Sequence, residues 1–254
     1  MRILKIILFI SFLAFMTQCK EKLKEGEQQL GPYTLTPASQ SATFEGASLV
    51  LKSPEAEAIE PGDITMQFNV ENFKLGEQTP DKDVKKLANS SKGQHIHLIM
   101  NNGPYKAIYS DSTTQPLANG EHVILAFLSR SYHESLKSQS THALRVFRTA
   151  GATANFDLNG QHLFYSRPKG SYSLSEAKGI MVDFYLVNTT LSKKGNNVEL
   201  TLNGHKALLT DWQPVIVNGL TEGEHTVSLR LLNSEGQLIK GPFNTVTRTF
   251  KITE

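Results

Sequence analysis

The chain lacks cysteine almost entirely, with one among 254 residues, Cys19. Without a second cysteine it can form no intrachain disulfide, and its folded part can hold neither a Cys-x-x-Cys metal site nor a cysteine nucleophile. It also lacks a net charge of either sign: the formal charge is +2, and two of the basic residues, Arg2 and Lys5, precede Cys19. The remainder has 24 basic and 24 acidic side chains, so no general attraction to nucleic acid is expected.

Motifs for the common enzyme chemistries are missing as well. No GxxxxGK[ST], GxGxxG, HExxH or GxSxG pattern occurs, so nucleotide binding and the familiar hydrolase and zinc-protease chemistries lack their usual residues. The composition, 39% hydrophobic and 20% charged, is that of an ordinary globular protein. We therefore expect a protein that binds something and does not catalyse a reaction.

The first 18 residues have the pattern of a signal peptide. A short basic start is followed by an apolar run from Ile6 to Met16, which is too short to span a membrane. The run ends in Met16-Thr17-Gln18-Cys19, which resembles the lipobox of Bacteroidetes lipoproteins. That resemblance implies a lipid on Cys19 and a membrane anchor in the bacterial cell envelope, on the periplasmic or the surface face of the outer membrane. A simple secretory signal and an uncleaved anchor are the alternatives.

The polar segment of residues 19–43 is rich in Gln, Ser, Thr, Pro and Gly and shows little apolar periodicity. We expect it to be a flexible tether between the lipid and the folded part. Its charged beginning, Lys20 to Glu27, resembles the export tags that bring some Bacteroidetes lipoproteins to the cell surface.

Beyond the tether the sequence repeats itself. Such self-similarity predicts two homologous domains, which we place at residues 44–150 and 151–254. The matching segments are residues 64–72 with 180–188, 93–101 with 195–203, and 117–147 with 220–250.

Both copies consist of short runs that alternate apolar and polar residues, separated by Gly-Pro, Asn-Gly and Glu-Gly turns. Alternation with a period of two predicts strands with one face in a core and the other towards water or a partner. Two all-β units of about 100 residues fit tandem immunoglobulin-like β-sandwiches. The repeated L-x-x-G-E-H-x-x-x-L text resembles bacterial Ig-like modules, a likeness that informs about fold and not about function.

The duplication provides an internal control, because residues present in both copies serve the fold more often than a site. His122 and His225 occupy the same Gly-Glu-His position, and Arg145 matches Arg248, so we assign these four to structure.

The first copy differs from the second at three places: residues 76–92 are inserted, His95 and His97 replace Asn197 and Glu199, and residues 130–137 replace 233–240. In immunoglobulin topology the insertion is the B–C loop and residues 130–137 form the F–G loop, which emerge at the same end.

These differences predict a candidate metal site. His95 and His97 are two residues apart on one strand and share a face, opposite to Ile96 and Leu98. With His133 from the neighbouring loop they supply three imidazoles, a ligand set that suits Cu or Zn.

Other interpretations of the same tip stay open. Arg130 and Lys137, with Ser131 and His133, have the chemistry of an anion-binding loop for a phosphorylated or acidic ligand or peptide. Tyr132, with Tyr105 and Tyr109, offers aromatic contacts for a glycan or protein partner. We thus expect a non-catalytic envelope lipoprotein. It would bind a ligand or partner at the tip of its first domain, through Arg130, Tyr132, His133 and Lys137. Metal binding, anion binding and a purely structural spacer are the alternatives.

Overall fold

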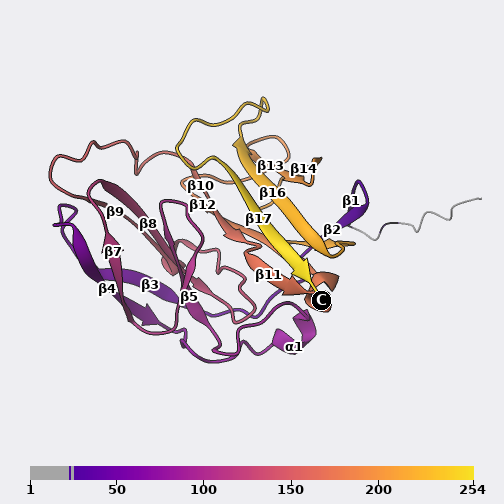
Figure 1. The fold of residues 1–254 in the computed structure, drawn as a ribbon, viewed down its shortest axis with the longest axis horizontal. Helices are drawn as coiled ribbons and strands as arrows, with labels where there is room; N and C mark the ends of the chain where they lie inside the picture. The colour runs from indigo at the N-terminus through magenta and orange to yellow at the C-terminus, as the bar shows by residue number, and fades with distance from the viewer. Residues whose placement is uncertain (1–22, 24–25) are drawn as a thin grey trace, which may run out of the picture.

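The computed structural model describes residue 23 and residues 26–254, so the predicted signal peptide and Cys19 lie outside the described residues. The described part is built of strands that form two β-sandwiches side by side (Figure 1). The short helical turns are α1 (Lys82–Lys85), η1 (Gln139–Thr141) and η2 (Glu176–Lys178). The tandem Ig-like fold predicted from the repeat is therefore observed.

The first sandwich has a three-stranded sheet in the order β3-β4-β7 and a four-stranded sheet in the order β6-β5-β8-β9. All its neighbouring strands are antiparallel. The bounds are β3 (Ser48–Ser53), β4 (Gly62–Glu71), β5 (His95–Met100), β6 (Lys106–Ile108), β7 (Ser112–Leu117), β8 (Glu121–Ser129) and β9 (His142–Arg148).

The second sandwich has two five-stranded sheets, in the orders β1-β2-β15-β12-β10 and β11-β17-β16-β13-β14. Its C-terminal strands β16 and β17 form one long antiparallel pair (Figure 1). The bounds are β1 (Gln28–Leu30), β2 (Tyr33–Pro37), β10 (His162–Arg167), β11 (Gly170–Ser173), β12 (Ile180–Val187), β13 (Asn197–Leu202), β14 (His205–Leu209), β15 (Val215–Asn218), β16 (Gly223–Leu232) and β17 (Thr245–Thr253).

The flexible tether predicted for residues 19–43 is wrong for part of its length. Strand β2 pairs with β15 through Leu35 opposite Val217 and Pro37 opposite Val215, and β1 extends the sheet. Leu30 and Leu35 are buried in the core of the second sandwich. The two leucines were not recognised as core residues because the segment is polar in composition, and the strand partner of Leu35 lies about 180 residues further along the chain. The second sandwich therefore includes a piece of chain that precedes the first.

Each sandwich has its own apolar core, and a third core lies between the two. This third cluster joins side chains from β5 and β8 to side chains from β10 and β12, and Phe127 stacks on Tyr185 with ring centroids 4.7 Å apart. Strands β8 and β12 are consequently buried on both faces, which explains their nearly continuous apolar sequences. This packing places the outer face of β5 under the second sandwich.

Within the described part of the chain, no helix has the length and apolar character needed to cross a membrane.

Candidate metal centre

Strand β5 supplies the first two histidines. Ile96 and Leu98 point into the core of the first sandwich, whereas His95, His97 and Ile99 point the other way, as the alternation predicts. Of the two surroundings expected for this face, water or a partner, water does not apply, because His95 and His97 are both 0% exposed. The second sandwich covers them with β10, so the face became an interface between domains.

The third histidine comes from the turn after β8. Its backbone closes with two hydrogen bonds, from the His133 N–H to the Arg130 carbonyl (2.9 Å) and from the Arg130 N–H to the Glu134 carbonyl (2.9 Å). His133 adopts a left-handed conformation with φ 69°. The corresponding residue of the second sandwich is Gly236, with φ 76° in the same hydrogen-bonded turn.

His133 and Gly236 show that this turn requires a left-handed backbone, which glycine adopts without strain. A residue with a Cβ is strained in the left-handed region, and such strain is found mainly where the side chain has a task. Of the two copies, only the first carries an imidazole at this position, and that imidazole points at the other two.

The three imidazoles converge. The His97 Nε2 lies 2.9 Å from the His95 Nε2, and the His133 Nδ1 lies 3.1 Å from the same atom. All three candidate ligand nitrogens lie within 4.8 Å of one another, and no other group of three His, Cys, Asp or Glu side chains in the described residues is arranged to hold a metal.

Hydrogen bonds fix which nitrogen of each strand histidine faces the centre. The His95 Nδ1 donates to the Gly93 carbonyl (2.8 Å), which leaves the lone pair of the neutral ring on Nε2. The His97 Nδ1 is 3.2 Å from the Ser166 hydroxyl, which again leaves Nε2 towards the centre. Ser166 is the extra residue of a bulge in β10, since the register with β12 shifts between Tyr165 and Arg167. Outer contacts of this kind orient histidine ligands in metal sites.

Aromatic rings enclose the cluster. Tyr105 stacks on His97 with ring centroids 3.6 Å apart and planes 10° apart, and the Phe127 ring centroid lies 5.2 Å from that of His97. Tyr109 lies 5.0 Å from His95. The Tyr105 hydroxyl is 3.3 Å from the His133 Nδ1. Of the three histidines, His133 alone is partly exposed, so it marks the side from which an ion would reach the centre.

The environment keeps the imidazoles neutral. Burial lowers the pKa of His95 to about 4 and that of His133 to about 2, with Arg167 acting in the same direction on both. Burial also lowers the pKa of His97 well below its usual value, and the other two histidines, Arg167 and Lys169 add to the effect. At neutral pH all three rings therefore carry lone pairs and no charge, which is the state that binds metal.

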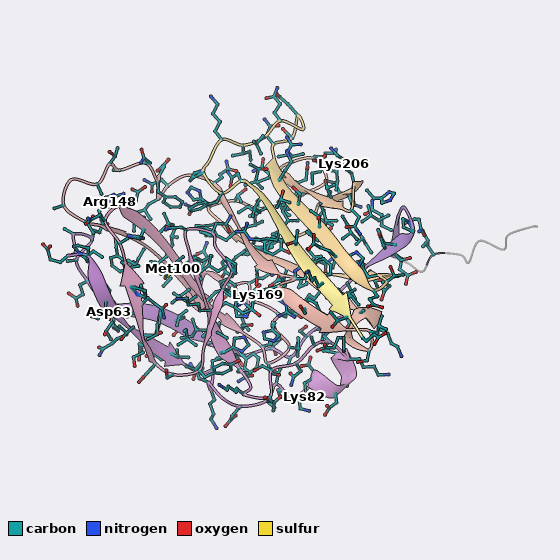
Figure 2. The ribbon with its side chains drawn as sticks, viewed as in Figure 1. Asp63, Lys82, Met100, Arg148, Lys169 and Lys206 are labelled. Atoms are coloured by element: carbon teal, nitrogen blue, oxygen red, sulfur yellow. The ribbon has the colours of Figure 1, made fainter. Side chains whose placement is uncertain are left out.

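Arg167 and Lys169 extend from the end of β10, in the second sandwich. The Arg167 Nη1 donates to the Tyr105 hydroxyl (2.8 Å). The Lys169 Nζ donates to the Tyr105 carbonyl (2.7 Å) and lies 4.5 Å from the centre of that ring, at the middle of the molecule in Figure 2. Neither cation was predictable from the sequence, because nothing in the sequence placed the second copy over the outer face of the first.

The loop of residues 130–137 is not an exposed tip, contrary to expectation. Arg130 is 8% exposed, and its guanidinium donates to the Glu134 carboxylate (3.2 Å) and to the Ala42 carbonyl. The Lys137 Nζ donates to the Asp183 carboxylate at 2.5 Å, across the domain interface. Both cations are thus paired with carboxylates of the chain. Neither has a free charge for the anionic ligand that the sequence suggested.

Tyr132 does not face a partner either. It is 0% exposed, and its hydroxyl donates to the Asp81 carboxylate (3.2 Å) in the inserted loop. Thr79 and Ser131 exchange two further hydrogen bonds between the same loops. The predicted contact between the B–C insertion and the F–G loop is therefore confirmed, but its role is to pack and position the His133 turn.

The repeated histidines make the same contact in both copies. The His122 Nε2 bonds to the Ala118 carbonyl (2.8 Å) and the His225 Nε2 to the Thr221 carbonyl (2.7 Å), each four residues upstream. This equivalence agrees with their assignment to the fold.

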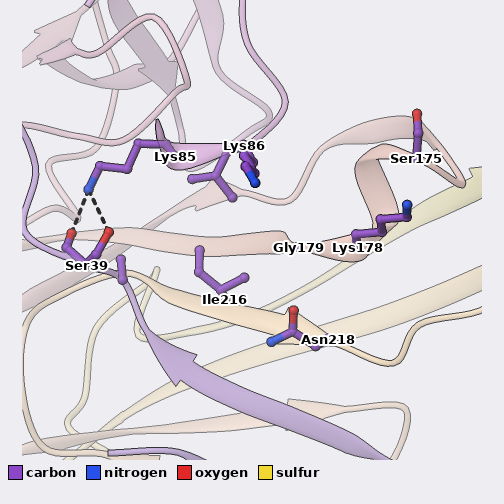
Figure 3. A pocket seen from close by; sticks show the side chains of 10 residues that line it. Ser39, Lys85, Lys86, Ser175, Lys178, Gly179, Ile216 and Asn218 are labelled. Carbon is purple, nitrogen blue, oxygen red and sulfur yellow. Dashed lines mark hydrogen bonds between the residues drawn. The ribbon is translucent and has the colours of Figure 1, made fainter. Parts of the chain in front are cut away.

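A pocket of about 450 Å³ lies elsewhere, between α1 and the second sandwich (Figure 3). Lys86 and Lys178 line it together with Ile216 and Asn218, while the Lys85 ammonium is held by the backbone and hydroxyl of Ser39. No predicted site residue faces this pocket, and its side chains do not converge on one point (Figure 3).

The known proteins similar to this chain are solved structures of low sequence identity. No family model matches the chain, and no curated relative matches it. Among solved structures it is similar to the fibronectin(III)-like modules of Clostridium thermocellum CbhA (12% identity, 80% of this chain and 92% of that chain covered, TM-score 0.26). It is also similar to a two-domain fibronectin type-III segment of chicken tenascin (11%, 81% and 98%, TM-score 0.22) and to the D00-D0 domain of intimin (12%, 82% and 100%, TM-score 0.24). The tandem Ig-like β-sandwich fold is given by the strand order of the chain itself.

Proposed function

We propose that this chain is a non-catalytic metal-binding protein that holds one Cu or Zn ion with His95 Nε2, His97 Nε2 and His133 Nδ1. The observation that carries the proposal is the convergence of three neutral imidazoles from two separate segments at the interface of two sandwiches. Imidazole nitrogen is a preferred ligand of both metals.

The internal repeat supports a role for these side chains beyond packing. At the three matching positions the second sandwich has Asn197, Glu199 and Gly236, and it folds in the same way without any imidazole there. Histidine at the His133 position adds backbone strain that glycine avoids. The fold therefore does not require the three histidines.

The envelope location belongs to the same proposal and rests on the sequence. Met16-Thr17-Gln18-Cys19 after a short apolar run supports a lipid-anchored protein of the bacterial cell envelope. With a lipid on Cys19, few residues would separate the membrane from β1, which begins at Gln28. Strand β1 of the second sandwich would then lie close to the membrane.

Titration calorimetry of Cu(II) and Zn(II) tests the proposal. The full chain with Cys19→Ser, which removes the one thiol, is compared with the same chain carrying His95→Ala and His97→Ala. We expect one-to-one binding with micromolar or lower Kd that the double substitution abolishes. His205→Ala is the matched control, because His205 is an exposed histidine on β14. Heat signals that persist unchanged in the double variant would contradict a metal centre at these residues.

A further inference from the structure

The donor set at the centre is small. A structural zinc site takes four ligands in a tetrahedron, and the cluster offers three. The Tyr105 hydroxyl is the nearest further oxygen, but its ring is stacked face to face on His97 at 3.6 Å. A metal on the His97 Nε2 lies in the plane of that imidazole, whereas the phenol oxygen lies in the parallel plane. That separation exceeds a zinc–oxygen bond of about 2.0–2.2 Å.

The His95 Nε2 lies close to the ligand nitrogens of the other two histidines. A tetrahedral zinc ion with Zn–N bonds of about 2.0–2.1 Å needs each pair of nitrogens about 3.3–3.4 Å apart. Here two separations are 2.9 and 3.1 Å, both involving the His95 Nε2, and all three nitrogens lie within 4.8 Å of one another. Both of these separations are shorter than a tetrahedral zinc ion requires. Low coordination by two or three nitrogens suits Cu(I), whereas Zn(II) in proteins takes four ligands.

The charges around the centre are positive. Arg167 acts on all three imidazoles and Lys169 on two of them, as the lowered pKa values record, and no carboxylate belongs to the cluster among the described residues. The repulsion between a fixed cation and a metal ion grows in proportion to the charge of the ion. A divalent ion thus meets twice the repulsion of a monovalent one, in a buried place where water screens little.

From these observations, and resting on the proposed function, we infer that the centre selects monovalent copper, Cu(I), over Cu(II) and Zn(II). Three neutral nitrogens bring no negative charge to balance a dication, and among the described residues no fourth His, Cys, Asp or Glu side chain joins the group. The partly exposed His133 then provides the side of access.

The first test measures the affinity for each metal ion. The full chain with Cys19→Ser is titrated anaerobically with Cu(I) in competition with bicinchoninate, and separately with Zn(II) and Cu(II). We expect one Cu(I) per chain, bound at least about 100-fold more tightly than Zn(II). Zn(II) or Cu(II) bound as tightly as Cu(I), and lost with His95→Ala and His97→Ala, would overturn the selectivity and leave the proposed function standing. Absence of binding by all three ions would overturn both.

The second test removes one of the two cations. Lys169→Gln deletes a charge from an exposed residue and leaves the buried Arg167 in place, so the fold should be kept. If the affinity for Cu(I) rises by a given factor, that for Zn(II) should rise by the square of the factor, for example roughly threefold and tenfold. Lys206→Gln, on β14 at the far edge of the second sandwich (Figure 2), is the control and should change neither affinity. Equal gains for the two ions would refute the argument from charge.

Discussion

Replacing His133 separates the backbone strain of its turn from the role of its imidazole. His133→Ala removes the ring but keeps a Cβ at φ 69°, whereas His133→Gly removes both the ring and the strain. The left-handed conformation costs a residue with a Cβ about 1–2 kcal/mol. The greater freedom of glycine in the unfolded chain offsets about 0.4–1 kcal/mol of this gain. The glycine variant should therefore be more stable than the alanine variant by about 1 kcal/mol.

Urea denaturation of the two metal-free variants measures this difference. With a slope of about 1–3 kcal/mol per molar urea, the midpoints should differ by about 0.3–1 M. Gly236→Ala supplies the reverse control, because a Cβ added at Gly236 meets nothing within 4 Å and only its φ of 76° is unfavourable. That control should lose about 1 kcal/mol. An alanine variant at position 133 as stable as the glycine variant would refute the claim that strain is retained there for the imidazole.

Three further predictions concern the rest of the structure. Because burial holds the pKa of His95 near 4 and that of His133 near 2, the unfolded chain takes up protons below about pH 6.5 while the folded chain does not. The free energy of unfolding of the metal-free protein should then fall by up to about 1.4 kcal/mol per pH unit for each histidine as the pH drops from 6.5 towards 4, and replacing the histidines should flatten a plot of stability against pH. Lys137→Met leaves the fully buried Asp183 carboxylate without its partner and should cost about 3–5 kcal/mol in urea denaturation, whereas Glu57→Gln at an exposed pair should change stability by less than about 0.5 kcal/mol. Leu35→Ala should cost about 2–5 kcal/mol, while Leu23→Ala, at an exposed leucine, should have no measurable effect, and equal effects would contradict a structured β2.

The sequence predicted a large part of the candidate centre. Period-two alternation placed His95 and His97 on one face of a strand, and the immunoglobulin topology brought the His133 turn next to it. Both the strand face and the neighbouring turn belong to one sandwich and follow from its local geometry. The comparison of the two copies also offered a further indication for His133. Its matching residue in the second copy is Gly236, a turn glycine with positive φ, and a side chain at such a position is strained.

What the sequence did not predict depends on contacts between distant segments. The burial of His95 and His97, and the approach of Arg167 and Lys169, follow from the packing of one sandwich on the outer face of the other. Alternation identifies a second face but not what covers it. Strand β2 was not predicted for the same reason. Its pairing with β15 places two leucines of a polar segment in the core.

The central claim is that the three histidines together bind one metal ion, and X-ray absorption spectroscopy of the copper-loaded chain with Cys19→Ser tests it most directly. We expect copper to be bound only by nitrogen and the spectrum to show the outer-shell scattering of about three imidazole rings. His95→Ala/His97→Ala should lose both the metal and that scattering. A copper shell made of oxygen or sulfur, or a spectrum that the double substitution leaves unchanged, would contradict it.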